Sequence, residues 1–271
     1  MRLPMYQIDA FTDQLFSGNP AAVCPLRAWL PDPILQRIAL ENNLSETAFT
    51  VPLESPGAYG LRWFTPTVEV DLCGHATLAA AWVHSFMLGA GSRLRFQTRS
   101  GELTVTRHED TLEMDFPSVP PLPSGPPPAL AAVLGHPPQE VHEMRPVHGA
   151  RYFLAVYDRA AEVAGLSPDT DAMRDVLGAN VIATAPSDTP DQDFVSRFFA
   201  PASGVPEDPV TGSAHCSLAP YWAARLGQER LVGRQISARG GTVVCILDGE
   251  RVRLQGRGVL YLSGEIHLPA P

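Results

Sequence analysis

The chain repeats a set of landmarks at a nearly constant spacing of half its length. Arg62 and Arg197 each begin an Arg–aromatic–Phe run that leads to a proline turn, and they stand 135 positions apart. Gly74 and Gly212 each open an apolar helical segment and are 138 positions apart. Two further pairs keep this spacing: Gly89 with Gly227, 138 apart, and Pro31-Asp32 with Pro168-Asp169, 137 apart. This offset predicts two halves with the same fold.

A proline-rich segment lies near the middle of the chain. Residues 119–128, VPPLPSGPPP, suit neither a helix nor a central strand, so we expect a linker there. The predicted domains are residues 1–118 and 129–271, and the sequence leaves open whether the last strand returns to the first domain. Because two like halves commonly bring equivalent edges together at a cleft, we expect the site at the domain interface.

Composition excludes several classes of partner. The net charge of −9, without a lysine- or arginine-rich block, argues against nucleic acid and anionic membranes. No apolar run approaches the ~18 residues of a membrane span, and no leader pattern begins the chain, so we expect a cytoplasmic protein. The four cysteines lack CxxC spacing, and buried thiols are the default interpretation.

Both predicted motif helices begin with small residues. Gly74 follows Cys73 and precedes His75, and Gly212 precedes Ser213. Small residues let a ligand approach the free backbone N–H groups of a helix start, where the helix dipole favours an anion such as a carboxylate. Simple helix capping is the alternative interpretation. The duplication favours anion binding.

Three titratable residues are candidates for proton transfer. Glu46 lies within a β-branched, strand-like run, residues 44–51, where apolar neighbours should raise its pKa toward the range of a general base. The alternatives are a surface glutamate or a cap. His75 could shuttle a proton or cap its helix, and Asp208 could orient that histidine, bind an ammonium group or simply start a turn.

Other site chemistries lack sequence support. Two groups of potential ligands are each close in sequence but follow no usual zinc spacing, so we expect no metal: Asp71, Cys73 and His75, and His215 and Cys216. No GxGxxG or GxxxxGK[ST] motif supports a nucleotide cofactor, and no GxSxG elbow supports a hydrolase.

Six segments, in order along the chain, resemble the phenazine-biosynthesis PhzF-like family, whose relatives include diaminopimelate epimerase. The segments are Gln7–Thr12, Ser17–Val23, Leu44–Phe49, Arg62–Pro66, Cys73–Ala79 and Asp208–His215. The resemblance implies two pseudo-symmetric α+β domains, each a sheet wrapped around a central helix. It also implies an isomerase without cofactor that acts on a small carboxylate-bearing substrate, and commonly a homodimer.

The resemblance also assigns roles to particular residues. The family glutamate that moves a proton between substrate carbons matches Glu46, and the family histidine and aspartate match His75 and Asp208. The remaining expected substrate contacts lie in the matching segments: Gly74, Gly212, Ser213, Asn19 and Ser45.

The sequence departs from the epimerase relatives at a cysteine. These relatives use a cysteine from each half; Cys73 matches the first, but Thr211 stands near the second, and Cys216 lies about one helical turn further on. We therefore favour Glu46 chemistry over a cysteine-assisted racemase using Cys73. A member of the fold that binds a small molecule without turnover is the third alternative.

Overall fold

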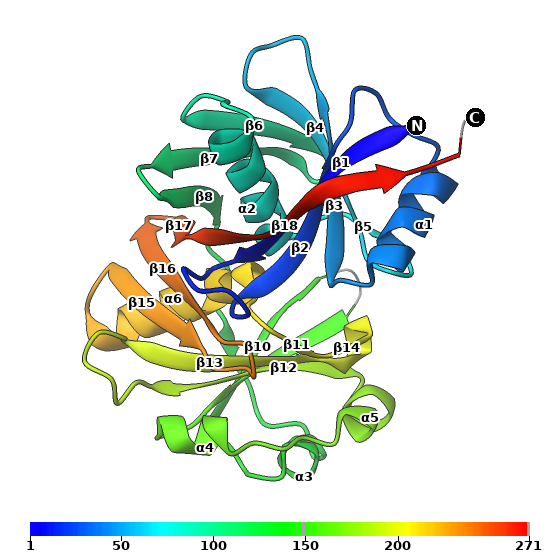
Figure 1. The fold of residues 1–271 in the computed structure, drawn as a ribbon. Coiled ribbons are helices and arrows are strands. Elements are labelled where there is room, and N and C mark those ends of the chain that lie inside the picture. Colours follow the sequence, from blue (N-terminus) through cyan, green and yellow to red (C-terminus); the bar gives the residue numbers. More distant parts are fainter. Residues whose placement is uncertain (148–149, 270–271) are drawn as a thin grey trace. The chain divides into compact units, whose positions relative to one another are not determined.

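The chain forms two compact units in a computed structural model that describes residues 1–147 and 150–269 (Figure 1). The first unit contains residues 1–115 and the segment from Gln255 onward, and the second contains residues 116–254. The divisions fall within strands β8 and β17. The proline-rich segment at residues 119–128 belongs to the second unit and includes the short strand β9, which pairs with β10.

The elements of the first unit, in chain order, are β1 (Arg2–Ala10), β2 (Asn19–Pro25), α1 (Asp32–Asn42), β3 (Glu46–Pro52), β4 (Ala58–Phe64), β5 (Glu69–Val70), α2 (Gly74–Trp82), the π-helical turn η1 (Val83–Met87), β6 (Arg93–Thr98), β7 (Gly101–His108), β8 (Thr111–Pro117) and β18 (Gly258–His267). Strand β18 runs antiparallel to β1, pairing Arg2 with His267, so the first and last strands lie side by side (Figure 1).

The elements of the second unit are β9 (Leu122–Pro123), α3 (Leu130–Leu134), β10 (Glu140–Val147), β11 (Ala150–Val156), α4 (Ala160–Ala164), α5 (Thr170–Ala172), the π-helical turn η2 (Met173–Leu177), β12 (Ala179–Pro186), β13 (Phe194–Ala200), the 3₁₀ turn η3 (Pro201–Ser203), β14 (Val205–Asp208), α6 (Gly212–Leu226), β15 (Arg230–Gln235), β16 (Gly241–Asp248) and β17 (Arg251–Gly256).

The two units share one strand-pairing scheme. In the first unit, β1–β2, β3–β4, β4–β5 and β6–β7 are antiparallel, whereas β2–β3 and β4–β6 are parallel. In the second, β10–β11, β12–β13, β13–β14 and β15–β16 are antiparallel, whereas β11–β12 and β13–β15 are parallel. The same senses occur in the same order, with α2 and α6 in equivalent places. The predicted duplication of the fold is confirmed.

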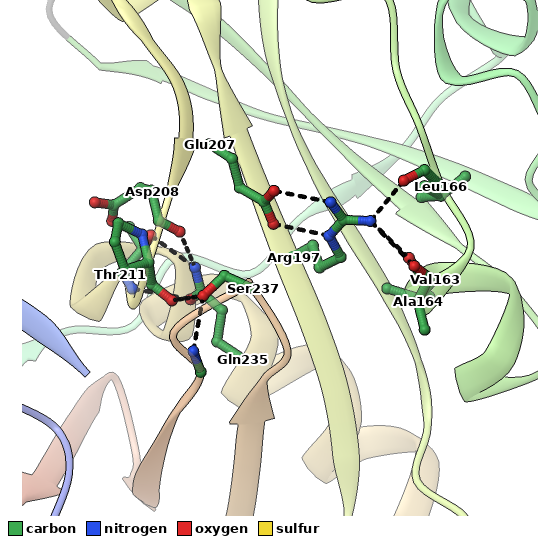
Figure 2. A network of polar contacts seen from close by, with 11 residues as sticks. Val163, Ala164, Leu166, Arg197, Glu207, Asp208, Thr211, Gln235 and Ser237 are labelled. Carbon is green, nitrogen blue, oxygen red and sulfur yellow. Dashed lines mark hydrogen bonds and ion pairs between the residues drawn. The ribbon is translucent and has the colours of Figure 1, made fainter. Parts of the chain in front are cut away.

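An ion pair repeats along with the strands. Arg62 in β4 donates from Nε and Nη2 to both carboxylate oxygens of Glu69 in β5, at 2.7 Å each. Arg197 in β13 likewise donates from Nε and Nη2 to the two carboxylate oxygens of Glu207 in β14, at 2.7 and 2.8 Å (Figure 2). Bidentate pairs of this kind fix orientation as well as distance. Each pair therefore fixes the position of a short strand, β5 before α2 or β14 before α6.

Helix α2 is the centre of the first unit. Its alanine-rich sequence is apolar on all sides, a composition typical of a buried helix. The hydrophobic residues from Ala76 to Ala81 are fully buried. It packs against β1, β2 and β3. Gly256 passes so close to it that an added Cβ would lie 2.4 Å from Phe11 and 2.9 Å from Leu78. The sheet therefore wraps tightly around α2.

Helix α1 covers another part of the first unit. Proline within its first turn and Asn43 in a left-handed conformation set its start and end. Its buried face, Leu35, Ile38 and Ala39, packs on Phe49 of β3. This packing fixes the approach to β3, the strand that begins with Glu46.

Candidate active site

Four predicted or candidate site residues meet at the start of α2. Cys73 is the N-cap of the helix in an extended conformation, and His75 follows Gly74 in its first turn. Glu46 is the first residue of β3, and Asn19 is the first residue of β2. Because β2 and β3 run parallel and both pack on α2, their first residues lie beside the helix start. The strand begins at Glu46 rather than at Leu44, so the carboxylate stands at the strand's entrance and not within it.

His75 is the centre of this cluster. Its Nε2 lies 3.0 Å from Oε2 of Glu46. Its Nδ1 lies 3.2 Å from Nδ2 of Asn19 and 3.5 Å from Sγ of Cys73. The side chains of His75 and Glu46 are 6% and 17% exposed, so the carboxylate retains some access while the imidazole is almost enclosed.

Burial and neighbouring charge act in opposite directions on His75. Burial lowers its pKa, whereas the Cys73 sulfur and the Glu46 carboxylate raise it. The raising effects together are larger, and the pKa of His75 lies well above its usual value. The carboxylate is the cause that persists near neutral pH, since an opposite charge at hydrogen-bond distance stabilises an imidazolium. The Glu46 carboxylate therefore favours the imidazolium form of His75.

Cys73 remains a thiol. Burial raises its pKa, the negative charge of Glu46 raises it further, and His75 only partly offsets them, giving a pKa of about 11. A thiolate is the reactive form of cysteine, so this sulfur is a poor base near neutral pH. Cys216 is no better placed, because its Sγ contacts the Gly212 carbonyl at 3.8 Å within α6 and burial raises its pKa to about 12.

The second predicted cluster surrounds the start of α6 in the second unit. Asp208 ends β14, and Thr211, the N-cap of α6, donates its hydroxyl to Asp208 Oδ2 in a short hydrogen bond (Figure 2). Gly212 is buried at the first helical position, and Ser213 after it is exposed. The loop therefore presents a half-buried carboxylate beside a helix start.

Gln235 fixes this loop. It is fully buried at the end of β15, where its Nε2 donates to the Asp208 carbonyl at 2.7 Å and its Oε1 accepts from the Thr211 amide at 2.9 Å (Figure 2). Ser237 adds a bond from its hydroxyl to the Pro209 carbonyl at 2.8 Å. Sequence reasoning missed both residues. A glutamine in a strand gives no signal of this kind, because its partners come from a loop more than twenty residues away.

The predicted site residues thus fall into two local groups. Glu46, His75, Asn19 and Cys73 meet in the first unit, with Gly74 between Cys73 and His75 and half-buried Ser45 directly before β3. The second unit contains Asp208, Gly212 and Ser213. A hollow of about 340 Å³ in that unit, lined in part by Pro121, Pro220 and Tyr221, includes none of them.

Comparison with known proteins identifies the class. The profile of phenazine biosynthesis-like proteins (PhzC-PhzF) matches residues 8–264. An uncharacterized isomerase of Pseudomonas aeruginosa is 53% identical over 269 residues, which cover 99% of this chain and all of that protein. A crystal structure of a PhzF-family protein from Enterococcus faecalis is 44% identical, with a TM-score of 0.91, covering 99% of this chain and 100% of that one.

A structure of low sequence identity shares the fold of this chain. A probable proline racemase from Agrobacterium radiobacter K84 matches with a TM-score of 0.65 over 98% of this chain and 93% of its own, at 12% identity, which shows the fold alone. The protein is an isomerase with the two-domain epimerase-like fold. The chain belongs to the PhzC-PhzF family of phenazine biosynthesis-like proteins. Among the residues described, no helix is both long and apolar enough to cross a membrane.

Proposed function

We propose that this isomerase moves a proton between two carbons of a small carboxylate-bearing substrate, with Glu46 as the group that removes and returns the proton. The observation that carries the proposal is the 3.0 Å contact between Glu46 Oε2 and His75 Nε2 at the start of α2. It holds a partly accessible carboxylate against an imidazole whose pKa is raised. A base in a carbon-to-carbon transfer must also be an acid, and a carboxyl group can be both.

The environment supports a division of roles. In the proposed reaction, the Glu46 carboxylate takes the proton from one carbon, and the electron pair of that C–H bond passes into the substrate's conjugated system. The Glu46 carboxylic acid then returns the proton to another carbon, so the reaction is redox-neutral. His75 holds the carboxylate in position and supplies positive charge beside it, and Asn19 at 3.2 Å fixes the imidazole ring. Electrostatic stabilisation that is in place before the reaction is a principal source of catalysis.

The thiol mechanism has weaker support. Cys73 would have to act as a thiolate, yet burial and the charge of Glu46 raise its pKa to about 11. The position corresponding to a second cysteine is Thr211, whose hydroxyl is engaged with Asp208. A carboxylate base needs no such second thiol. The same proton-transfer group also favours an enzyme over a protein that only binds.

Residues of both units are proposed to contact the substrate. We assign the free N–H groups at the start of α2, around Gly74, to a substrate carboxylate, with Ser45 beside Glu46 as a further contact. In the second unit we assign substrate binding to Asp208, Gly212 and Ser213. We also propose that the chain acts as a homodimer, which light scattering during gel filtration tests by returning the mass of two chains.

A solvent-exchange screen tests the function. The protein is incubated in D₂O with a panel of small amino and hydroxy acids, and mass spectrometry follows gain of one mass unit at carbon. The proposal expects deuterium in a subset of compounds with a C–H bond next to the carboxylate or conjugated with it. Incorporation that persists in Cys73→Ser and is lost in Glu46→Gln supports Glu46, whereas the reverse pattern supports the thiol mechanism.

A further inference from the structure

The Glu46–His75 cluster has a second chemical property that proton transfer does not use. Glu46, Cys73 and His75 each offer one metal-ligating atom, and these three atoms all lie within 4.8 Å of one another. They come from two elements, the first residue of β3 and the start of α2, that are packed together in one unit. No such site is visible from sequence, because Cys73-Gly74-His75 is not a zinc motif and Glu46 lies well before it.

We propose that Glu46, Cys73 and His75 bind a zinc ion, which occupies the base and switches the isomerase off. A tetrahedral zinc site places its oxygen and nitrogen ligands about 3.4 Å apart and its sulfur and nitrogen ligands about 3.6 Å apart, from the usual bond lengths. His75 Nε2 lies 3.0 Å from Glu46 Oε2 and 4.0 Å from Cys73 Sγ. Side-chain shifts of about half an ångström bring these two pairs into the range of zinc. The Glu46 oxygen and the Cys73 sulfur, which lie within 4.8 Å of each other, must also move closer together.

The donor set selects the metal. A thiolate, an imidazole and a carboxylate are the ligands of zinc, whereas magnesium and calcium prefer sites made of oxygen atoms alone. Three protein ligands leave a fourth position open for water or for a substrate carboxylate. Zinc binding replaces water ligands of the hydrated ion by Zn–S, Zn–N and Zn–O bonds and releases the thiol and imidazolium protons to solvent, so it needs no oxidant or reductant.

The switch follows from the shared ligand. A Glu46 carboxylate bound to zinc is a much weaker base, because the cation withdraws charge from both of its oxygens. His75 Nε2 is committed as well, so the pair at 3.0 Å no longer exists. Zinc is thus an inhibitor of this enzyme and not its cofactor. The inhibition rests on the proposed function, whereas the zinc site itself does not.

Cobalt titration of the full chain without substrate tests the site. Co²⁺ is a spectroscopic substitute for Zn²⁺: a tetrahedral site with a thiolate gives a sulfur-to-cobalt charge-transfer band in the near ultraviolet and visible d–d bands. We expect both bands at one Co²⁺ per chain and their loss when one equivalent of Zn²⁺ is added. Cys73→Ser should remove the charge-transfer band, and Glu46→Gln should weaken binding by about 10²-fold or more.

Cys216→Ser is the control, since it removes another buried thiol, one in the second unit, while a serine hydroxyl can keep the bond to the Gly212 carbonyl. It should leave both bands unchanged. Circular dichroism shows whether each variant is folded, and Cys73→Ala, which is smaller and apolar, serves if Cys73→Ser is not. Absence of the bands in the wild-type protein, or their persistence in Cys73→Ser and Cys73→Ala, overturns the zinc site while leaving the proposed isomerase unaffected. With a substrate in hand, zinc that binds without slowing turnover overturns the switch alone.

Discussion

His75 Nε2 lies 3.0 Å from Glu46 Oε2, although 28 residues separate the two in the chain. The parallel pairing of β2 and β3 beside α2 produces this contact, and Asn19 and Cys73 complete the surroundings of the imidazole. The pair defines the proposed acid–base centre, and each of its neighbours can be tested separately.

Cys73→Ser should retain most of the turnover. The Cys73 thiol is protonated near neutral pH because burial and the charge of Glu46 raise its pKa to about 11, so its loss removes no base. We expect a change in kcat of less than about 10-fold, against ~10³-fold or more for loss of a covalent or acid–base group. Steady-state kinetics on a substrate from the exchange screen decide between the two, and a loss of the larger size would restore the cysteine mechanism.

His75→Gln should lower kcat more than it changes KM. Glutamine can still donate a hydrogen bond to Glu46, but it lacks the positive charge that the imidazolium places beside the carboxylate. The loss of preorganised charge should cost about 10–10³-fold in kcat. His84→Gln is a matched control elsewhere in the unit, since His84 is a buried histidine that contacts Thr50 at 2.9 Å. Equal kinetic losses in both variants would indicate a structural effect only.

Gln235→Leu should impair the loop between β14 and α6. It removes the bonds to the half-buried Asp208 carbonyl and to the buried Thr211 amide. We expect a destabilisation of about 1–3 kcal/mol and a loss of kcat/KM larger than stability alone explains. Gln97→Leu is the control, because Gln97 lies on the equivalent strand β6 and bonds Glu102 at the surface. Denaturant unfolding measures the loss of stability. Kinetics under conditions where the variant is fully folded measure the loss of kcat/KM.

Stability should fall in mild acid because of buried histidines. Burial lowers the pKa of His215 to about 4, and its Nδ1 donates to the Thr211 carbonyl at 2.8 Å. Above the unfolded pKa of ~6.5 both states are neutral and nothing is lost. Between pH ~6.5 and ~4 the unfolded state binds the additional proton, so the free energy of unfolding falls, by up to about 3 kcal/mol for this residue.

His215→Asn isolates this contribution. The asparagine amide can keep the bond to the Thr211 carbonyl without titrating, so the acid loss should shrink. It should not vanish, because burial also lowers the pKa of His84 to about 4. Urea unfolding at a series of pH values measures the difference; parallel pH profiles for the wild type and the variant would contradict it.

Much of the architecture was predictable from the spacing of turn residues and helix starts. Gly74 and Gly212 begin α2 and α6, and Gly227 ends α6 in a left-handed conformation, which suits glycine. The strand around Glu46 was predicted to begin too early, at Leu44, since local propensity sets a strand's boundary poorly. Residues 119–128 were predicted to be a linker, yet they include β9, because an edge position accepts proline.

The site was predictable only where the chemistry is local. Cys73 and His75 share one turn, and the family resemblance added Glu46. Other contacts depend on how distant segments pack. These are the hydrogen bonds of Gln235, the ion pair of Arg197 with Glu207, and the proximity of Glu46 to Cys73 and His75. No periodicity in a single sequence encodes such contacts. The catalytic role expected of Asp208 stays a prediction. So do the substrate contacts expected of Gly74, Gly212, Ser213, Asn19 and Ser45.

The most direct measurement is the deuterium exchange of Glu46→Gln with a substrate from the screen. The amide keeps the shape of the side chain but cannot accept the proton, so the rate of incorporation and kcat should both fall by about 10²–10⁴-fold while substrate binding persists. Glu54→Gln, at an exposed position after β3, is the control and should match the wild type. Incorporation at the wild-type rate in Glu46→Gln would contradict the assignment of Glu46 as the proton-transfer group.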